Sequence, residues 1–189
     1  MMIVFLNGPP KSGKDYAGRA LLSLFPGART AKFSRILKER THGLYGIYDN
    51  GRPVPHDWFE DCKDEPAKEF LGLTPRHAYI SVSEGYLKPK HGESVLGELL
   101  VQELLSHSAP LVAVTDSGFV QEAEKVVEHF GAARCKLVQL HRKECSFDND
   151  SRGYVDLSHM GVPPIEVHND GTSDFIEELI LALHDVLPK

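Results

Sequence analysis

The residues best suited to chemistry lie in one glycine-rich loop near the start of the chain. An apolar run at residues 2–6 leads into Gly8, and Gly13-Lys14 complete the spacing Gly-x-x-x-x-Gly-Lys before a stretch of helical periodicity. A loop placed between a strand and a helix surrounds phosphate groups with backbone N–H groups, and the helix N-terminus adds partial positive charge. We expect the phosphates of a nucleotide to bind to Gly8, Lys11, Ser12, Gly13 and Lys14.

The residue after the lysine departs from the usual pattern of such a loop. Ser or Thr normally places its hydroxyl on Mg²⁺ there, and this chain has Asp15. A carboxylate also holds a hard cation, directly or through water. The alternative is a chance glycine loop that carries an acidic residue at the start of a helix.

A second acidic candidate, Asp116, follows the apolar run at residues 111–115, which is typical of a buried strand. In phosphate-loop proteins an acidic residue at the end of a neighbouring strand commonly orients Mg²⁺. The alternative is a cap, because Asp-Ser-Gly is also ordinary turn chemistry.

Three basic residues are candidates for binding the phosphate of a second substrate: Arg35, Arg76 and Lys88. Arg35 follows a short predicted strand at residues 28–33, and open α/β sheets bind ligands at the carboxyl ends of their strands. Arg35 could equally be a solvated helix-face arginine. Arg76 and Lys88 could instead pair with the acidic residues between positions 57 and 65.

The polar segment at about 141–158 follows another predicted strand, residues 134–140, and has the composition of a lid. Arg142 and Arg152 lie within it. Arginines in such a lid can stabilise the charge of a phosphoryl group during transfer. The alternative is a solvated loop.

The remaining pattern supplies the elements that must position these residues. Helical periodicity begins after Ser34, which we expect to be an N-cap, and after Thr74-Pro75, where the predicted helix ends near Gly85. Leucines at helical spacing (Leu96, Leu99, Leu100 and Leu104) indicate a core helix, although they could serve a homodimer. The last predicted helix is capped by Thr172 or Ser173.

The stretch from residue 42 to 73 is rich in glycine, proline and aromatic residues, and is too long for a simple loop. We interpret it as an insertion over the active site. Its aromatic residues, Tyr45, Tyr48, Trp58 and Phe59, could hold a base between rings or could serve only to pack the insertion.

Composition limits the class of protein. The 189 residues predict one domain with a sizeable core, and 41% hydrophobic with 25% charged residues is ordinary for a globular protein. The formal net charge of -6 argues against a general nucleic-acid binder. Three widely spaced cysteines favour reduced thiols in the cytosol, and neither a signal peptide nor a membrane-spanning run is expected.

Four motifs give the chain a resemblance to the P-loop nucleoside monophosphate kinases, and most of all to the phage-type deoxynucleoside monophosphate kinases. They are residues 5–15 with the ending Gly-Lys-Asp, residues 74–89 with Thr-Pro-Arg and Ser-Glu-Gly, residues 114–116, and residues 169–172 before the last helix. The first and last are specific as a pair. The resemblance suggests a phage origin, and hence the host cytoplasm.

The resemblance implies a five-stranded parallel sheet in a three-layer α/β/α sandwich, with an acceptor-binding insertion at about 42–92 and a short lid. It implies ATP, Mg²⁺ and transfer of the γ-phosphoryl group to a (deoxy)nucleoside monophosphate. By position, Lys14 would stabilise transferring charge, and Asp15 and Asp116 would hold or orient Mg²⁺. Arg35 and Arg76 would grip the acceptor, Arg142 and Arg152 would be lid arginines, and the loop with Asn169 and Gly171 would cradle adenine.

One departure concerns the acceptor. The resembling family often has an arginine two residues after the strand-end aspartate, and this chain has Gly118 there. Other residues must then supply part of the binding of the acceptor's phosphate, or the acceptor itself differs. Alternatives are a kinase for another small acceptor such as dephospho-coenzyme A, a non-catalytic ATP-sensing module, and a polynucleotide end kinase, which the acidic charge disfavours.

Overall fold

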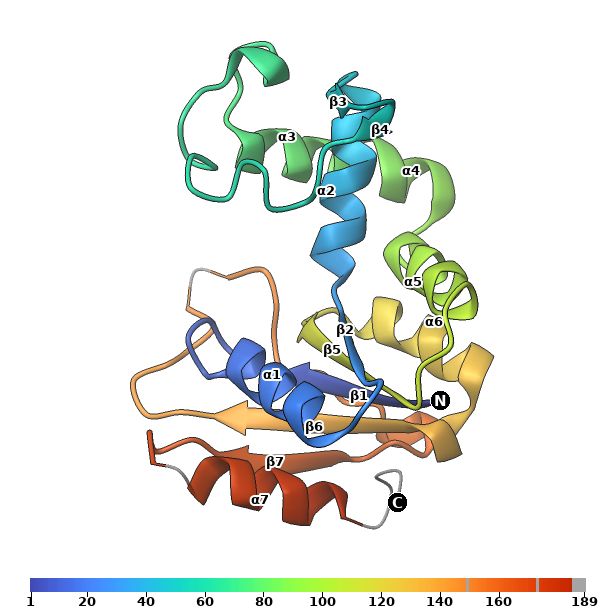
Figure 1. Cartoon of the computed structure of the whole chain (residues 1–189), viewed down its shortest axis with the longest axis vertical. Helices are drawn as coiled ribbons and strands as arrows, with labels where there is room; N and C mark the ends of the chain where they lie inside the picture. The colour runs from blue at the N-terminus through green and yellow to red at the C-terminus, as the bar shows by residue number, and fades with distance from the viewer. Residues whose placement is uncertain (149, 173, 185–189) are drawn as a thin grey trace.

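A five-stranded parallel sheet forms the centre of the molecule, in the order β2-β5-β1-β6-β7 (Figure 1). The computed structural model describes residues 1–148, 150–172 and 174–184. The strands are β1 (Met2–Asn7), β2 (Arg29–Ala31), β5 (Leu111–Ser117), β6 (Cys135–His141) and β7 (Pro164–His168). This confirms the predicted sheet, including its parallel strands.

The two central neighbours of β1 explain why its residues are so apolar. Phe5 pairs with Val114 on one side and with Leu137 on the other, and all three are fully buried. A parallel strand covered on both faces is expected to be a continuous hydrophobic run. The carboxyl ends of β1, β5 and β6 therefore meet at one edge, where the glycine loop leaves β1.

Helices cover both faces of the sheet, which confirms the three layers (Figure 1). Two helices, α1 (Lys14–Leu24) and α7 (Asp174–Leu183), bury Leu21 and Phe175 against one face. The other face carries α5 (Val95–Leu105), α6 (Val120–Phe130) and the first turn of α2 (Phe33–Leu44). Three of the four leucines of the predicted face on α5, Leu96, Leu100 and Leu104, are buried in this core.

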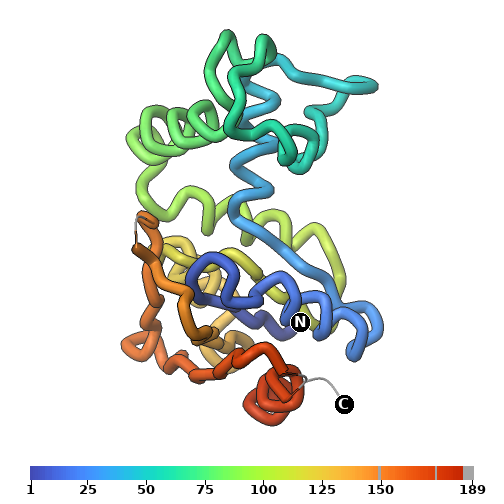
Figure 2. Tube along the Cα trace, turned by 90° about the vertical axis from the view of Figure 1, so that its left-hand side faces the viewer, coloured from blue at the N-terminus to red at the C-terminus, as the bar shows by residue number. Residues whose placement is uncertain are grey.

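The insertion stands above the sheet on α2 and forms a small hydrophobic core of its own (Figures 1 and 2). It includes the short strands β3 (Tyr48–Asp49) and β4 (Arg52–Pro53) and the helix α3 (Pro75–Val82). A π-helical turn, Ser83–Leu87, continues α3 into α4 (Lys88–His91), so the helical path runs past the predicted end near Gly85.

The aromatic residues of the insertion mostly pack against one another. Phe59 and Tyr45 contact Phe70 edge to face, with ring centroids 4.9 and 5.2 Å apart. Tyr48 and Trp58 are 53% and 59% exposed. The packing interpretation therefore describes Tyr45 and Phe59, whereas Tyr48 and Trp58 lie at the surface.

Two further observations concern the described residues only. None of their helices is long and apolar enough to cross a membrane, and no group of three or more His, Cys, Asp or Glu side chains is arranged to hold a metal ion. The three cysteines Cys62, Cys135 and Cys145 are free thiols.

Candidate active site

The glycine loop connects β1 to α1 and closes around the side chain of Lys14. The Nζ atom of Lys14 donates hydrogen bonds to the carbonyl oxygens of Gly8 and Pro9, at 2.6 and 2.7 Å. Burial and the nearby guanidinium of Arg152 lower the pKa of Lys14 to about 8. A bound anion at the mouth of the loop would favour the charged form of the amine and so raise its pKa again.

One glycine of the loop, Gly13, is required by a close approach. Gly13 has φ +106°, and a Cβ atom there would lie 2.5 Å from Nδ2 of Asn169. That same Nδ2 donates to the carbonyl of Ser12 at 2.9 Å, and Oδ1 of Asn169 accepts from the amide of Gly171 at 3.0 Å. Asn169, in the loop before α7, therefore holds the phosphate loop in place, and Gly171 in turn holds the Asn169 side chain. Both residues were predicted to contact adenine.

Asp15 lies at the start of α1, beside the carboxyl end of β5. Its carboxylate pairs with Lys32 at 2.7 Å and accepts a hydrogen bond from the hydroxyl of Thr115 at 3.1 Å. Burial opposes ionisation of Asp15, but the contacts with Lys32 and Thr115 outweigh it and lower its pKa. Asp15 and Thr115 thus present two oxygen atoms of the kind that Mg²⁺ prefers.

Asp116 caps the N-terminus of α2. Its two carboxylate oxygens accept hydrogen bonds from the backbone amides of Phe33 and Ser34, at 2.9 and 2.8 Å. The predicted N-cap at Ser34 is wrong, because α2 begins at Phe33 and no side chain at the cap position bonds to it. A carboxylate from a different strand instead neutralises the helix end, so Asp116 fixes α2 to the sheet.

Arg152 occupies the space that a side chain at position 118 would need. A Cβ atom on Gly118 would lie 2.6, 2.7 and 2.8 Å from Cδ, Cγ and Cβ of Arg152. The guanidinium makes a two-pronged pair with Asp150, at 2.9 and 2.6 Å, and this pair lowers the pKa of the Asp150 carboxyl. The stem of Arg152 therefore lies against position 118, where the sequence has no arginine.

Two buried amides hold this part of the lid segment against the sheet. Nδ2 of Asn7 donates to the carbonyls of Ser117 and Gly153, and its Oδ1 accepts from the amide of Val155, all within 2.8–2.9 Å. Gln139 donates to the carbonyl of Val155 at 2.8 Å. These contacts start from the ends of β1 and β6 and fix the backbone next to Arg152.

Arg142, the other lid arginine, lies on the opposite side of the loop and donates to the carbonyl of Lys11 at 3.1 Å. It lines an open cavity of about 400 Å³ with His141, Tyr154 and Asn169. The rings of His141 and Tyr154 stack with centroids 4.7 Å apart. This cavity adjoins the phosphate loop and has a flat aromatic wall.

A larger cleft of about 560 Å³ lies between the sheet and the insertion. Its lining includes Asp116 and Arg152 on the sheet side and Arg76 on α3. Arg76 also pairs with Asp64 at 2.6 Å, which is the ion pairing considered for this residue. Its binding of an acceptor phosphate stays a prediction. Lys38 on α2 lines the cleft too and pairs with Glu60 at 2.6 Å.

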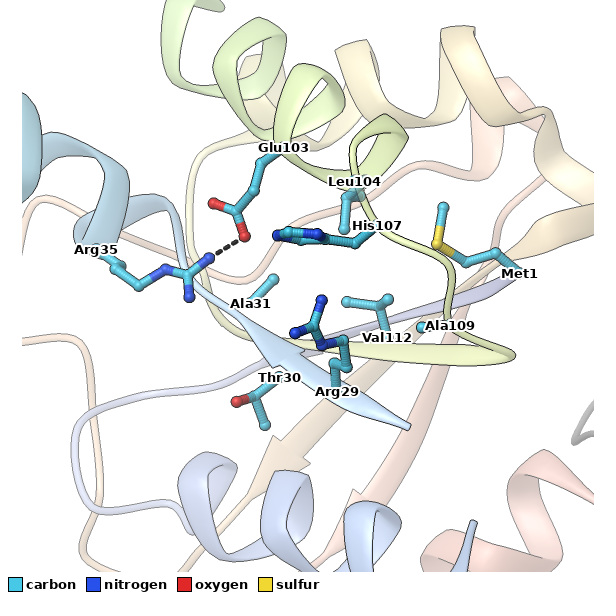
Figure 3. Close-up of a pocket in the computed structure, with 10 residues that line it drawn as sticks. All are labelled: Met1, Arg29, Thr30, Ala31, Arg35, Glu103, Leu104, His107, Ala109 and Val112. Atoms are coloured by element: carbon cyan, nitrogen blue, oxygen red, sulfur yellow. Dashed lines mark hydrogen bonds and ion pairs between the residues drawn. The ribbon is translucent and has the colours of Figure 1, made fainter. Parts of the chain in front are cut away.

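Two predicted acceptor-binding residues are not brought to this cleft. Figure 3 shows Arg35 paired with Glu103 at a separate cavity of about 90 Å³, which Arg29 also lines. Lys88 pairs with Glu84 at 2.7 Å and lies over the ring of Phe119, outside the residues that line the cleft.

The cleft contains a buried acid that sequence reasoning did not single out. Glu122, in the first turn of α6, is 2% exposed and lines the cleft. Burial, and then the charge of Asp116, raise the pKa of Glu122 to about 8. Among the described residues, none donates a hydrogen bond to its carboxyl group or forms an ion pair with it.

Comparison with known proteins supports the fold and goes no further. No protein-family model and no curated protein matches the sequence. The solved structures of similar shape include TT1252 from Thermus thermophilus, with a TM-score of 0.54, 15% identity, and coverage of 100% of this chain and 98% of that one. Shikimate kinase from Acinetobacter baumannii aligns with a TM-score of 0.39 and 16% identity over 97% of this chain and 75% of that one.

Proposed function

We propose that the chain is a phosphotransferase that moves the γ-phosphoryl group of ATP to a (deoxy)nucleoside monophosphate. The observation that carries this proposal is the phosphate loop with Lys14 beside Arg152, at the edge of a cleft of about 560 Å³. Two cavities adjoin the loop, one for each substrate. A cleft of this size is in the range that encloses a small ligand.

The residues around the loop fit ATP and Mg²⁺. The loop amides and Lys14 would hold the phosphates, and the cavity lined by His141 and Tyr154 would hold the base. Asp15 and Thr115 would hold the cation, because their oxygens meet at the loop and belong to the right chemical class. Bound Mg²⁺ would neutralise charge on the phosphates. Asp116 fits a direct ligand less well, because both of its oxygens already accept amides of α2.

The chain's own contribution to catalysis would be positioning and charge. An oxygen of the acceptor's phosphate attacks the γ-phosphorus, and the bond to the β-phosphate oxygen breaks as ADP leaves. Lys14 and Arg152 would stabilise the charge spread over the transferring group. Arg76 would attract the acceptor at the far wall of the cleft once Asp64 releases it.

The test is release of ADP from Mg·ATP against a panel of ribo- and deoxynucleoside monophosphates, with dephospho-coenzyme A as an outgroup. We expect one or a few monophosphates to stimulate ADP release. Stimulation by dephospho-coenzyme A alone would move the acceptor outside the nucleotides. A flat panel, with ATP binding measured separately by calorimetry, would overturn the proposal in favour of an ATP-sensing module.

A further inference from the structure

The buried carboxyl group of Glu122 results from the close contact between α5 and α6. Gly97 lies on α5 where a Cβ atom would be 2.3 Å from the backbone oxygen of Glu122. The absence of a side chain there lets the two helices approach at Glu122, which is buried. Ala123, the next residue, is in the core, whereas the side chain of Glu122 reaches the cleft wall.

This arrangement is costly for the protein alone. Burying a carboxylate without a partner is unfavourable, and replacing such a group by an apolar one is often neutral or stabilising. The charge of Lys88 acts on Glu122, but Lys88 already pairs with Glu84 at 2.7 Å and Glu93 at 3.4 Å. A titratable group with a perturbed pKa, set in a cleft, is a candidate functional residue.

The surroundings of Glu122 indicate which part of an acceptor it meets. Glu122 supplies no positive charge for a phosphate. The cations that line the cleft come from other elements: Lys38, Lys63, Arg76 and Arg152. Leu96 and Phe119 also line this cleft and supply apolar wall. A planar base has two apolar faces and a polar edge, so it suits apolar walls with one carboxyl group among them.

We infer that Glu122 reads the hydrogen-bonding edge of the acceptor's base, an inference that rests on the proposed function. The chemical class is a base with an exocyclic amino group beside a ring nitrogen. A carboxylic acid donates one hydrogen bond and accepts one, which matches cytosine and adenine. A carboxylate accepts two, which matches guanine. Thymine and uracil present a single N–H between two carbonyls and match neither form as well.

The experiment measures kcat/KM with dAMP, dCMP, dGMP and dTMP for the wild type and for E122L, E122Q and E128Q. Glu128 is a matched control, because it lies on the same helix and pairs with Lys125 at 2.8 Å on the surface. We expect the wild type to prefer an amino-bearing base over dTMP, and E122L to lower that preference about 10- to 100-fold. E122Q keeps one donor and one acceptor, so it should retain adenine or cytosine and lose guanine. E128Q should change nothing.

Three results would overturn the inference. The first two are a wild-type preference for dTMP and an unchanged base ratio in E122L whose melting temperature is at least that of the wild type. An equal loss with all four acceptors would also overturn it, because that pattern belongs to a sugar contact or a structural role. Dissociation constants for the four monophosphates, measured by calorimetry with a non-hydrolysable ATP analogue, give the same ratio. These dissociation constants test the inference even if the protein shows no turnover and the proposed function is wrong.

Discussion

The free energy of unfolding should fall as the pH rises through the titration of Glu122. The pKa of this carboxyl group is about 8 in the folded protein, against an ordinary value of 4.5. Between these values the folded protein keeps a proton that the unfolded chain releases, so the folded state loses stability as the pH rises. Since one pKa unit corresponds to about 1.4 kcal/mol, the loss between pH 4.5 and pH 8 is about 5 kcal/mol.

Urea unfolding at pH values from 4 to 9 measures this loss, with E122Q as the reference and E128Q as the control. The amide of E122Q does not ionise, so other titrating groups cancel in the difference between E122Q and the wild type. We expect that difference to be constant below pH 4.5, to grow by at most about 1.4 kcal/mol per pH unit, and to level off above pH 8. This loss is a large part of the 5–15 kcal/mol that typically holds a domain folded. Parallel curves for the two proteins would refute the reasoning.

The remaining predictions concern the loop, the cap and the arginine. Lys14→Ala should lower kcat by several orders of magnitude with an unchanged melting temperature, and near wild-type turnover in a steady-state assay would contradict the role of the loop. Asp116→Ala should lower the free energy of unfolding by about 1–2 kcal/mol, because both amides at the start of α2 lose their acceptor; urea unfolding checks this, and an unchanged midpoint would argue against the cap. Gly118→Ala should displace Arg152 and lower kcat/KM at least about tenfold, whereas Gly153→Ala, which meets no atom within 4 Å, should not; equal activity of the two variants would exclude Arg152 from the reaction.

The sequence was informative wherever the determinant is local. Apolar runs such as residues 111–115 predicted the buried strands, and the glycine spacing predicted the loop, because both depend on neighbouring residues. Leucine spacing on α5 predicted its buried face. The proposed capping residue Ser173 lies outside the described residues, so that part of the prediction stays open.

The site residues that escaped prediction depend on contacts between distant segments. Asp116 was predicted to be either a metal ligand or a cap, and it is a cap, but the amides it caps are 82 and 83 positions away and could not be identified from the sequence. Glu122 was not singled out from the sequence, because its burial depends on the close approach of a different helix, α5, at Gly97. Asn7 carried a usable signal, since an amide at the end of an apolar strand needs buried partners.

Arg152 lies against Gly118, the position where the sequence has no arginine two residues after Asp116. That departure implied that part of the acceptor's phosphate is bound by other residues, or that the acceptor differs. In the structure, a Cβ atom at position 118 would displace the stem of Arg152. Asn7 and Gln139 fix the backbone that delivers it, and Asp150 orients the guanidinium.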